Sequence, residues 1–244
     1  MDPSGIFPTS YRTDRRVVRT RWQMAALALF VGLMLAAPYL VSGRIVAILN
    51  MMMISAVIAV GLQICTGYAG QINLGQAAFM GVGAYTAAIL ASKTGLTFLL
   101  TIPLAGLSAA LFGFLFGLTA ARIKGFYLAL TTIAAQFIFH FAVLNLPSTW
   151  MGGSNDITVP PAELFGLRFV TETSQFYLNL VVATIMIAGA LGIVRSRFGR
   201  AFVAVRDDDV AAGIMGSNVA ATKANAFLIC AFYAGVGGAL WAYL

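Results

Sequence analysis

Apolar runs long enough to cross a lipid bilayer recur along almost the whole sequence. A spanning helix needs about 20 predominantly apolar residues, because the hydrocarbon core of a bilayer is roughly 30 Å thick. Continuous apolar runs cross such a core as helices, which satisfy their own backbone hydrogen bonds. The sequence therefore predicts an all-α, polytopic transmembrane helical bundle. About seven spans are expected, at 23–41, 45–65, 77–91, 97–121, 126–146, 176–194 and 226–244.

The composition supports the same class of protein. Hydrophobic residues make up 60% of the chain and charged residues only 9%, whereas soluble domains carry about 25% charged residues. The formal net charge is +7, but the basic residues are spread over several loops instead of one patch, so no nucleic-acid partner is expected. Cys65 and Cys230 both fall inside apolar runs, where we expect free, buried thiols.

The distribution of Lys and Arg predicts the orientation of the chain. If the N-terminal basic tail lies in the cytoplasm, only Arg44, Lys93 and Arg168 of the 15 basic residues fall on the external side of the membrane. Membrane proteins carry their excess of basic residues in cytoplasmic loops, so this orientation is favoured. The predicted regions are a cytoplasmic tail at 1–22 and a transmembrane domain at 23–244, with an external loop at 147–175 and a cytoplasmic loop at 195–223.

The predicted cytoplasmic loop has a residue pattern that a simple connection between two spans does not require. Three carboxylates, Asp207–Asp209, precede a small-residue segment with helical apolar spacing. Acidic residues at the start of a helix suit its positive dipole end and can cap its free amide groups. A short helix is therefore expected over 210–216, with a stop at Gly216. Its small side chains suit docking to another protein, although a solvated charged turn explains the pattern equally well.

A glycine-rich segment, G-Y-A-G-Q-I-N-L-G-Q-A-A-F at 67–79, separates the second and third predicted spans. Glycine favours interruption of a helix, so a broken or short helix is expected near 67–91. Unwound backbone inside a membrane must be covered by protein or line a water-filled cavity. Transporters use such breaks to expose polar groups to a solute. Close helix packing through small residues is the alternative interpretation. The candidate solute-path residues are Gly67, Gly70, Gln71, Asn73, Gly75 and Gln76.

Two further patterns inside the spans favour packing over chemistry. Small residues recur every four positions in the fourth span and form a ridge for close helix contact. The ridge residues are Ala105, Ala109, Gly113, Gly117 and Ala121. His140, the one histidine of the chain, lies four residues after Gln136 and so on the same helix face. An ionisable group in a span is a functional candidate, but a packing histidine is the preferred interpretation.

The two motif-bearing segments resemble one family. The segment 67–79 is similar to the motif G-Y-x-G-x-x-S-L-G-x-A-x-F, followed by G-x-G-A-Y, of the branched-chain amino acid permeases of ABC importers, with Asn73 in place of Ser. The cytoplasmic segment resembles the coupling loop of the same family, with Gly213 where a helix former is common. The residues that carry this second resemblance are Gly199–Ala201, Val205–Asp208, Ala211, Ala212, Met215 and Gly216.

The resemblance implies a permease subunit of an ABC importer that moves branched-chain or related amino acids inward across a bacterial or archaeal plasma membrane. The implied partners are cytoplasmic ATPase subunits, a second permease subunit and an external solute-binding protein. Family members extend past the position of Leu244, so a C-terminally truncated chain is expected. The implied ATPase-coupling residues are Arg206, Asp207, Asp208, Ala211, Ala212, Met215 and Gly216.

The sequence contains no phosphate-binding loop G-x-x-x-x-G-K-[ST], no zinc-binding helix motif and no nucleophile turn. The chain is therefore expected to bind no cofactor or metal itself and to be no enzyme, with ATP used by the partner subunit. Urea or short amides are alternative solutes within the same family. An ATPase-independent channel or secondary carrier, or a membrane scaffold, is the alternative from another class of protein.

Overall fold

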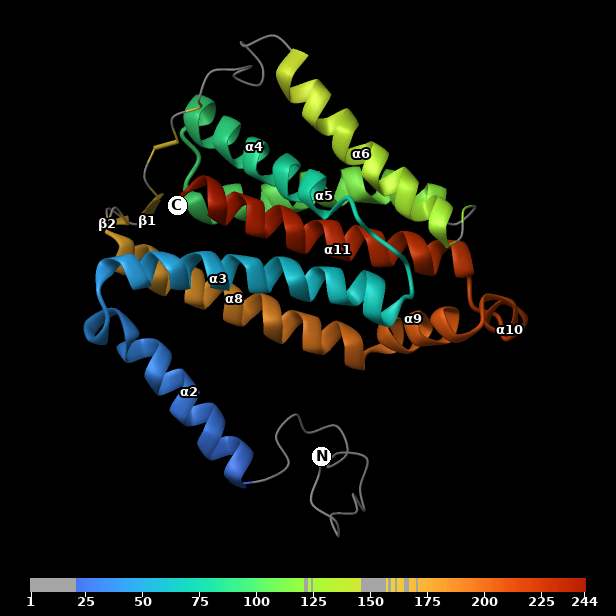
Figure 1. Cartoon of the computed structure of the whole chain (residues 1–244), viewed down its shortest axis with the longest axis horizontal. Helices are drawn as coiled ribbons and strands as arrows, with labels where there is room; N and C mark the ends of the chain where they lie inside the picture. Colours follow the sequence, from blue (N-terminus) through green and yellow to red (C-terminus); the bar gives the residue numbers. More distant parts are fainter. Residues whose placement is uncertain are drawn as a thin grey trace.

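The computed structural model describes residues 21–120, 123, 125–145, 157, 159–160, 162–164, 167–169 and 171–244. This part of the chain is almost entirely helical, which confirms the predicted all-α bundle (Figure 1). The helices are α2 (Arg21–Leu40), α3 (Gly43–Leu62), α4 (Gln76–Thr94), α5 (Phe98–Ala120), α6 (Phe126–Asn145), α8 (Glu172–Arg195), α9 (Arg197–Asp207), α10 (Asp209–Ile214) and α11 (Val219–Ala242). The other elements are the π-helical η1 (Gln63–Tyr68), which continues α3, and the strands β1 (Ala162–Leu164) and β2 (Leu167–Phe169).

A long helix stands at each of the seven predicted spans. Six of the described helices are long and apolar enough to cross a membrane, namely α2, α3 with η1, α5, α6, α8 and α11. The chain is therefore a multi-pass membrane protein. The third predicted span, α4, is not among these six and begins only at Gln76, after a break that follows Tyr68. This confirms the prediction of a broken or short helix near 67–91.

The helix α11 forms the centre of the bundle and packs against α5, α4 and α3 (Figure 1). Glycines bring these helices close together, since a Cβ added at Gly235 of α11 would strike Ala109 of α5 and one at Gly61 of α3 would strike Tyr233 of α11. The small-residue ridge predicted on α5 is this packing surface. Its members Ala105, Ala109, Gly113 and Gly117 are buried, and Ala121 lies outside the described residues.

The helices α2 and α6 lie at the edges of the bundle (Figure 1). The interpretation of His140 as a packing histidine is wrong for this chain, because the side chains of His140 and Gln136 are both exposed. The buried residues Thr132 and Ala135, which precede them in α6, make the contact with the bundle. The four-residue spacing predicts a shared side of the helix, but only the packing of α6 decides which positions on that side the bundle covers.

The predicted loop at 195–223 is mostly helical and holds more than the one short helix expected over 210–216. It comprises α9, α10 and the first turns of α11. The helix α9 is amphipathic and buries Phe202 and Val205 on one side. The side chain of Asn218 accepts a hydrogen bond from the amide of Ala221 at 3.0 Å, and this N-cap starts α11 at Val219 instead of the predicted 226.

The predicted external loop at 147–175 contains the strands β1 and β2, which form a small antiparallel hairpin with Ala162 opposite Phe169. Residues 147–156 of that region lie outside the described part of the chain, and so do residues 1–20 of the predicted tail. The helix α8 begins at Glu172, so the last residues of the predicted loop already belong to a helix.

Candidate functional site

The break between η1 and α4 carries the chain from the end of the bundle towards its middle (Figure 1). Gly70 has a left-handed backbone, with φ of 66°, and lets the chain leave η1. The amide Nε2 of Gln76 donates to the carbonyl oxygen of Ile58 in α3 at 3.3 Å. Ile58 precedes Tyr68 by ten residues, or about 15 Å of helix at 1.5 Å per residue. The helix α4 therefore begins well inside the bundle.

In the stretch between Gly70 and Gln76, the polar side chains are buried and the apolar side chains are exposed. Gln71, Asn73 and Gly75 are buried, whereas Ile72 and Leu74 are exposed. Burial therefore alternates from one residue to the next along this irregular stretch. The polar candidates for the solute path thus face the interior of the bundle.

The inward-facing polar groups bind one another and the central helix. The Nδ2 group of Asn73 donates to Oε1 of Gln76 at 2.9 Å, and the thiol of Cys230 donates to the same oxygen at 3.1 Å. Because Gln76 also reaches Ile58, this small cluster joins α3, α4 and α11. Cys230 and Cys65 are free and buried, as predicted. The sequence did not point to Cys230 as part of the site, since a cysteine in an apolar run looks like any other small buried residue.

The helix α6 closes the other side of the break. The amide of Leu74 donates to Oγ1 of Thr132 at 3.1 Å. A Cβ at Gly75 would collide with the carbonyl oxygen of Thr132, so only glycine allows α6 to approach this closely. Gly75 also N-caps α4 without a side-chain hydrogen bond. Thr132 lies in a different span from the motif, and its part in the site appears only in the structure.

The break and the helix α9 meet at the end of the bundle through Arg206. The Nη1 group of Arg206 donates to the carbonyl oxygen of Gly67 at 2.9 Å. A Cβ at Gly70 would lie 2.6 Å from Cγ of Arg206, so the arginine stem rests on the glycine backbone. The head of Arg206 also pairs with Oδ1 of Asp207 at 3.1 Å. The structure thus brings the two separately predicted segments into contact.

The short helix α10 has the cap and the stop that the sequence predicts. Oδ1 of Asp208 accepts hydrogen bonds from the amides of Val210 and Ala211 at 2.8 and 3.1 Å. Gly216 is left-handed, with φ of 86°, and the amide of Ser217 donates to the carbonyl of Ala212 at 3.0 Å. This is a Schellman ending, which glycine favours.

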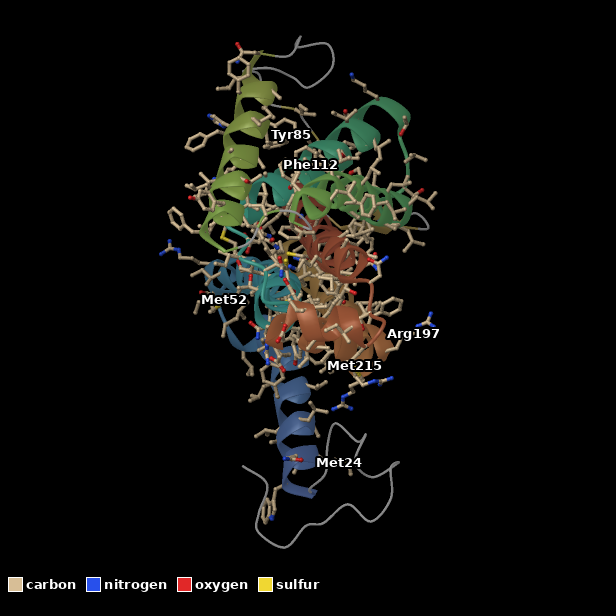
Figure 2. All side chains as sticks on the ribbon, turned by 90° about the vertical axis from the view of Figure 1, so that its right-hand side faces the viewer. Met24, Met52, Tyr85, Phe112, Arg197 and Met215 are labelled. Carbon is tan, nitrogen blue, oxygen red and sulfur yellow. The ribbon has the colours of Figure 1, made fainter. Side chains whose placement is uncertain are left out.

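Apolar side chains of the α10 region point away from the bundle. Val210, Ile214 and Met215 are 68%, 81% and 85% exposed. Figure 2 looks onto this end of the molecule and labels Met215 and Arg197 there. Of the two alanines proposed for coupling, Ala211 is exposed and Ala212 is buried. The exposed apolar surface lies at the same end as Arg206 and so beside the break.

An open hollow of about 300 Å³ lies between α10, the start of α11 and the break, with Gln71 and Arg206 among its lining residues. On its wall, Nζ of Lys223 lies 2.7 Å from Oδ2 of Asp209. Lys223 is only 2% exposed, so this ion pair is largely buried. Neither residue was among the predicted site residues. An unusual lysine early in an apolar helix, after a run of acidic residues, was the signal available.

The sequence model of the family described as branched-chain amino acid transport system, permease component, matches residues 44–243. The chain belongs to this permease family. The match covers the break, α9, α10 and Lys223, so the contacts described above all lie within the permease domain.

Two curated permeases are similar to the chain, and each is a high-affinity branched-chain amino acid transport system permease protein LivM. The protein of Salmonella typhimurium strain LT2 is 35% identical over 98% of this chain, and that of Escherichia coli strain K12 is 33% identical over the same share. The chain spans 60% of the length of each relative. No solved structure matches this permease.

Proposed function

We propose that this permease is the membrane subunit of an ABC importer that moves branched-chain or related amino acids inward. The contact of Arg206 with Gly67 and Gly70 carries the proposal, because it joins the helices at one end of the bundle to the interrupted segment in its interior. A movement of α9 and α10 has a direct path to the polar groups of the break. The names of the two LivM relatives support branched-chain amino acids as the solutes.

The proposed solute path runs along the break. Discontinuous helices in transporters place unwound backbone and free helix ends next to a polar solute. Here the inward amides of Asn73 and Gln76 bind Cys230 and Ile58, so a solute must replace these bonds with its own. Amide groups both donate and accept hydrogen bonds, which suits the ammonium and the carboxylate of an amino acid. The proposed path residues are Gly67, Gly70, Gln71, Asn73, Gly75 and Gln76.

The proposed partner at the other end of this path is an ATPase subunit that docks on α10. The exposed side chains of Val210, Ile214 and Met215 support this, because a contiguous apolar surface outside a membrane is typical of a protein contact. The basic residues favour a cytoplasmic position for this end, in a bacterial plasma membrane. ATP is then bound and used by the ATPase, and the permease itself holds no cofactor. A second permease subunit and an external solute-binding protein complete the proposed importer.

Variants that test the docking must change exposed side chains without disturbing α10 itself. Asp208 caps α10 and Ala212 is buried, so changes at these positions alter the helix itself. Ile214→Glu and Met215→Glu instead place a charge on the exposed face. We expect the double variant to lose co-purification with the ATPase encoded beside the permease, while its elution as a folded protein stays unchanged.

The matched control is Ala220→Glu, which adds the same charge at an exposed position in the first turn of α11. It should leave the ATPase bound. If the double variant still retains the ATPase, the proposed docking surface is wrong. Uptake of labelled leucine and of urea by the reconstituted importer then separates the two classes of solute.

A further inference from the structure

We propose that the ion pair between Lys223 and Asp209 ties the ATPase-facing helix α10 to the central helix α11 and transmits its movement. The two side chains meet at 2.7 Å, and the side chains of Lys223 and Asp209 are 3% and 18% exposed. Asp209 stands in the first turn of α10 and Lys223 in the second turn of α11. This inference rests on the proposed function and adds a second transmission path to that of Arg206.

The ion pair is a substantial part of the attachment of α10 to the bundle. The helix has six residues, of which Ala212 is the buried one, and Val210 and Ile214 point outwards. A buried ion pair adds little stability compared with apolar packing, but the two charges must stay together, because separating them leaves an uncompensated charge in the interior. A short helix with few packing contacts needs such a fixed attachment if it is to move its neighbour.

The helix α11 is suited to pass the movement on. Close to Lys223, a Cβ at Gly117 of α5 would lie 2.8 Å from Cα of Ala224, so α5 and α11 are in backbone contact there. Farther along, a Cβ at Gly83 of α4 would strike the backbone of Gly235. Helices in such close contact shift together, because no flexible side chain lies between them. Displacement at Lys223 therefore reaches α4, whose first residue borders the solute path.

Charge exchange in the assembled importer tests the tie. Lys223→Met and Asp209→Asn each remove one charge, and Lys223→Asp combined with Asp209→Lys restores the pair in reverse. The quantities measured are co-purification of the ATPase and the amount of leucine transported per ATP hydrolysed. We expect each single variant to bind the ATPase but to transport at least fivefold less leucine per ATP, and the exchange to return within twofold of the original ratio.

The matched control is Arg44→Met, which removes one exposed charge at the start of α3 and should leave the ratio unchanged. Single variants that keep the original ratio, or a folded exchange variant that stays as low as they do, overturn the tie. If Lys223→Met fails to fold, the Asp209→Asn variant and the double exchange variant are sufficient for the test. Their ratios of leucine to ATP either support the tie or overturn it in the same way. An unmodified chain that binds no ATPase overturns the proposed function as well, whereas a bound ATPase with unaltered ratios overturns the tie alone.

Discussion

Arg206 of α9 donates a hydrogen bond to the carbonyl oxygen of Gly67 in η1, at 2.9 Å, across 139 positions of sequence. That carbonyl is free for the contact because η1 ends at the next residue, Tyr68. One side chain thus satisfies the end of an interrupted helix and belongs to the region that we propose receives the ATPase. Arg206 therefore joins the proposed solute path to the proposed ATPase-facing region.

Replacing Arg206 should uncouple the permease without unfolding it. Arg206→Met keeps the stem that rests on Gly70 but removes the donor to Gly67, while the half-exposed position limits the loss of stability. We expect leucine uptake to fall about tenfold, the factor that roughly 1.4 kcal/mol of interaction represents. Uptake by the reconstituted importer measures the effect. Arg197→Met, which also replaces an exposed arginine of α9, serves as the control, and equal uptake in both variants contradicts the assignment.

Gly70 and Gly95 form a matched pair for the contact with Arg206. Both are left-handed, with φ of 66° and 62°, but a Cβ at Gly95 meets nothing within 4 Å whereas one at Gly70 meets Arg206. Each change to Ala costs about 1–2 kcal/mol of backbone strain, which lowers the melting temperature by roughly 2–4 °C per kcal/mol. We expect the larger drop in melting temperature and a loss of transport in Gly70→Ala, because its Cβ must also displace the stem of Arg206, and unchanged transport in Gly95→Ala. A Gly95→Ala variant that loses as much transport speaks against the contact.

The N-cap at Asp208 should control the stability of α10. Asp208→Ala removes the acceptor for the amides of Val210 and Ala211 and costs about 1 kcal/mol, whereas Asp208→Asn keeps a capping oxygen. Hydrogen exchange at these two amides should become about fivefold faster in Asp208→Ala and change little in Asp208→Asn. An equal increase in the exchange rates of the two variants would mean that the carboxylate acts through its charge instead of as a cap.

Close packing of α5 on α11 should not tolerate larger side chains. A Cβ at Gly113 would collide with Ala231, and a buried residue forced into a packed contact costs about 1–3 kcal/mol. We expect Gly113→Val to lower the melting temperature of the detergent-solubilised permease by several degrees. Gly192→Val is the control, since a Cβ there meets nothing within 4 Å on the exposed side of α8. Its melting temperature should be that of the unmodified permease.

Part of this architecture could be predicted from local sequence. Hydropathy located the helices, because a bilayer demands continuous apolar runs and the chain has no other way to satisfy its backbone there. Glycine and acidic residues located the break at Gly70 and the cap at Asp208, since both effects act within a few residues. The helix α9 in segment 195–223 was not predicted, because its arginines interrupt the apolar residues and a search for continuous apolar runs does not detect such an amphipathic helix.

The sequence by itself determined the helical class, the family and the two motif segments. Tertiary structure alone decided that Arg206 meets Gly67, that Thr132 and Cys230 border the break, and that Lys223 pairs with Asp209. The physical reason is the separation in sequence of the residues that interact. Helix formation, capping and glycine turns depend on neighbours within a few residues, whereas these contacts join residues of different helices, and the residues that meet depend on how all the helices pack together.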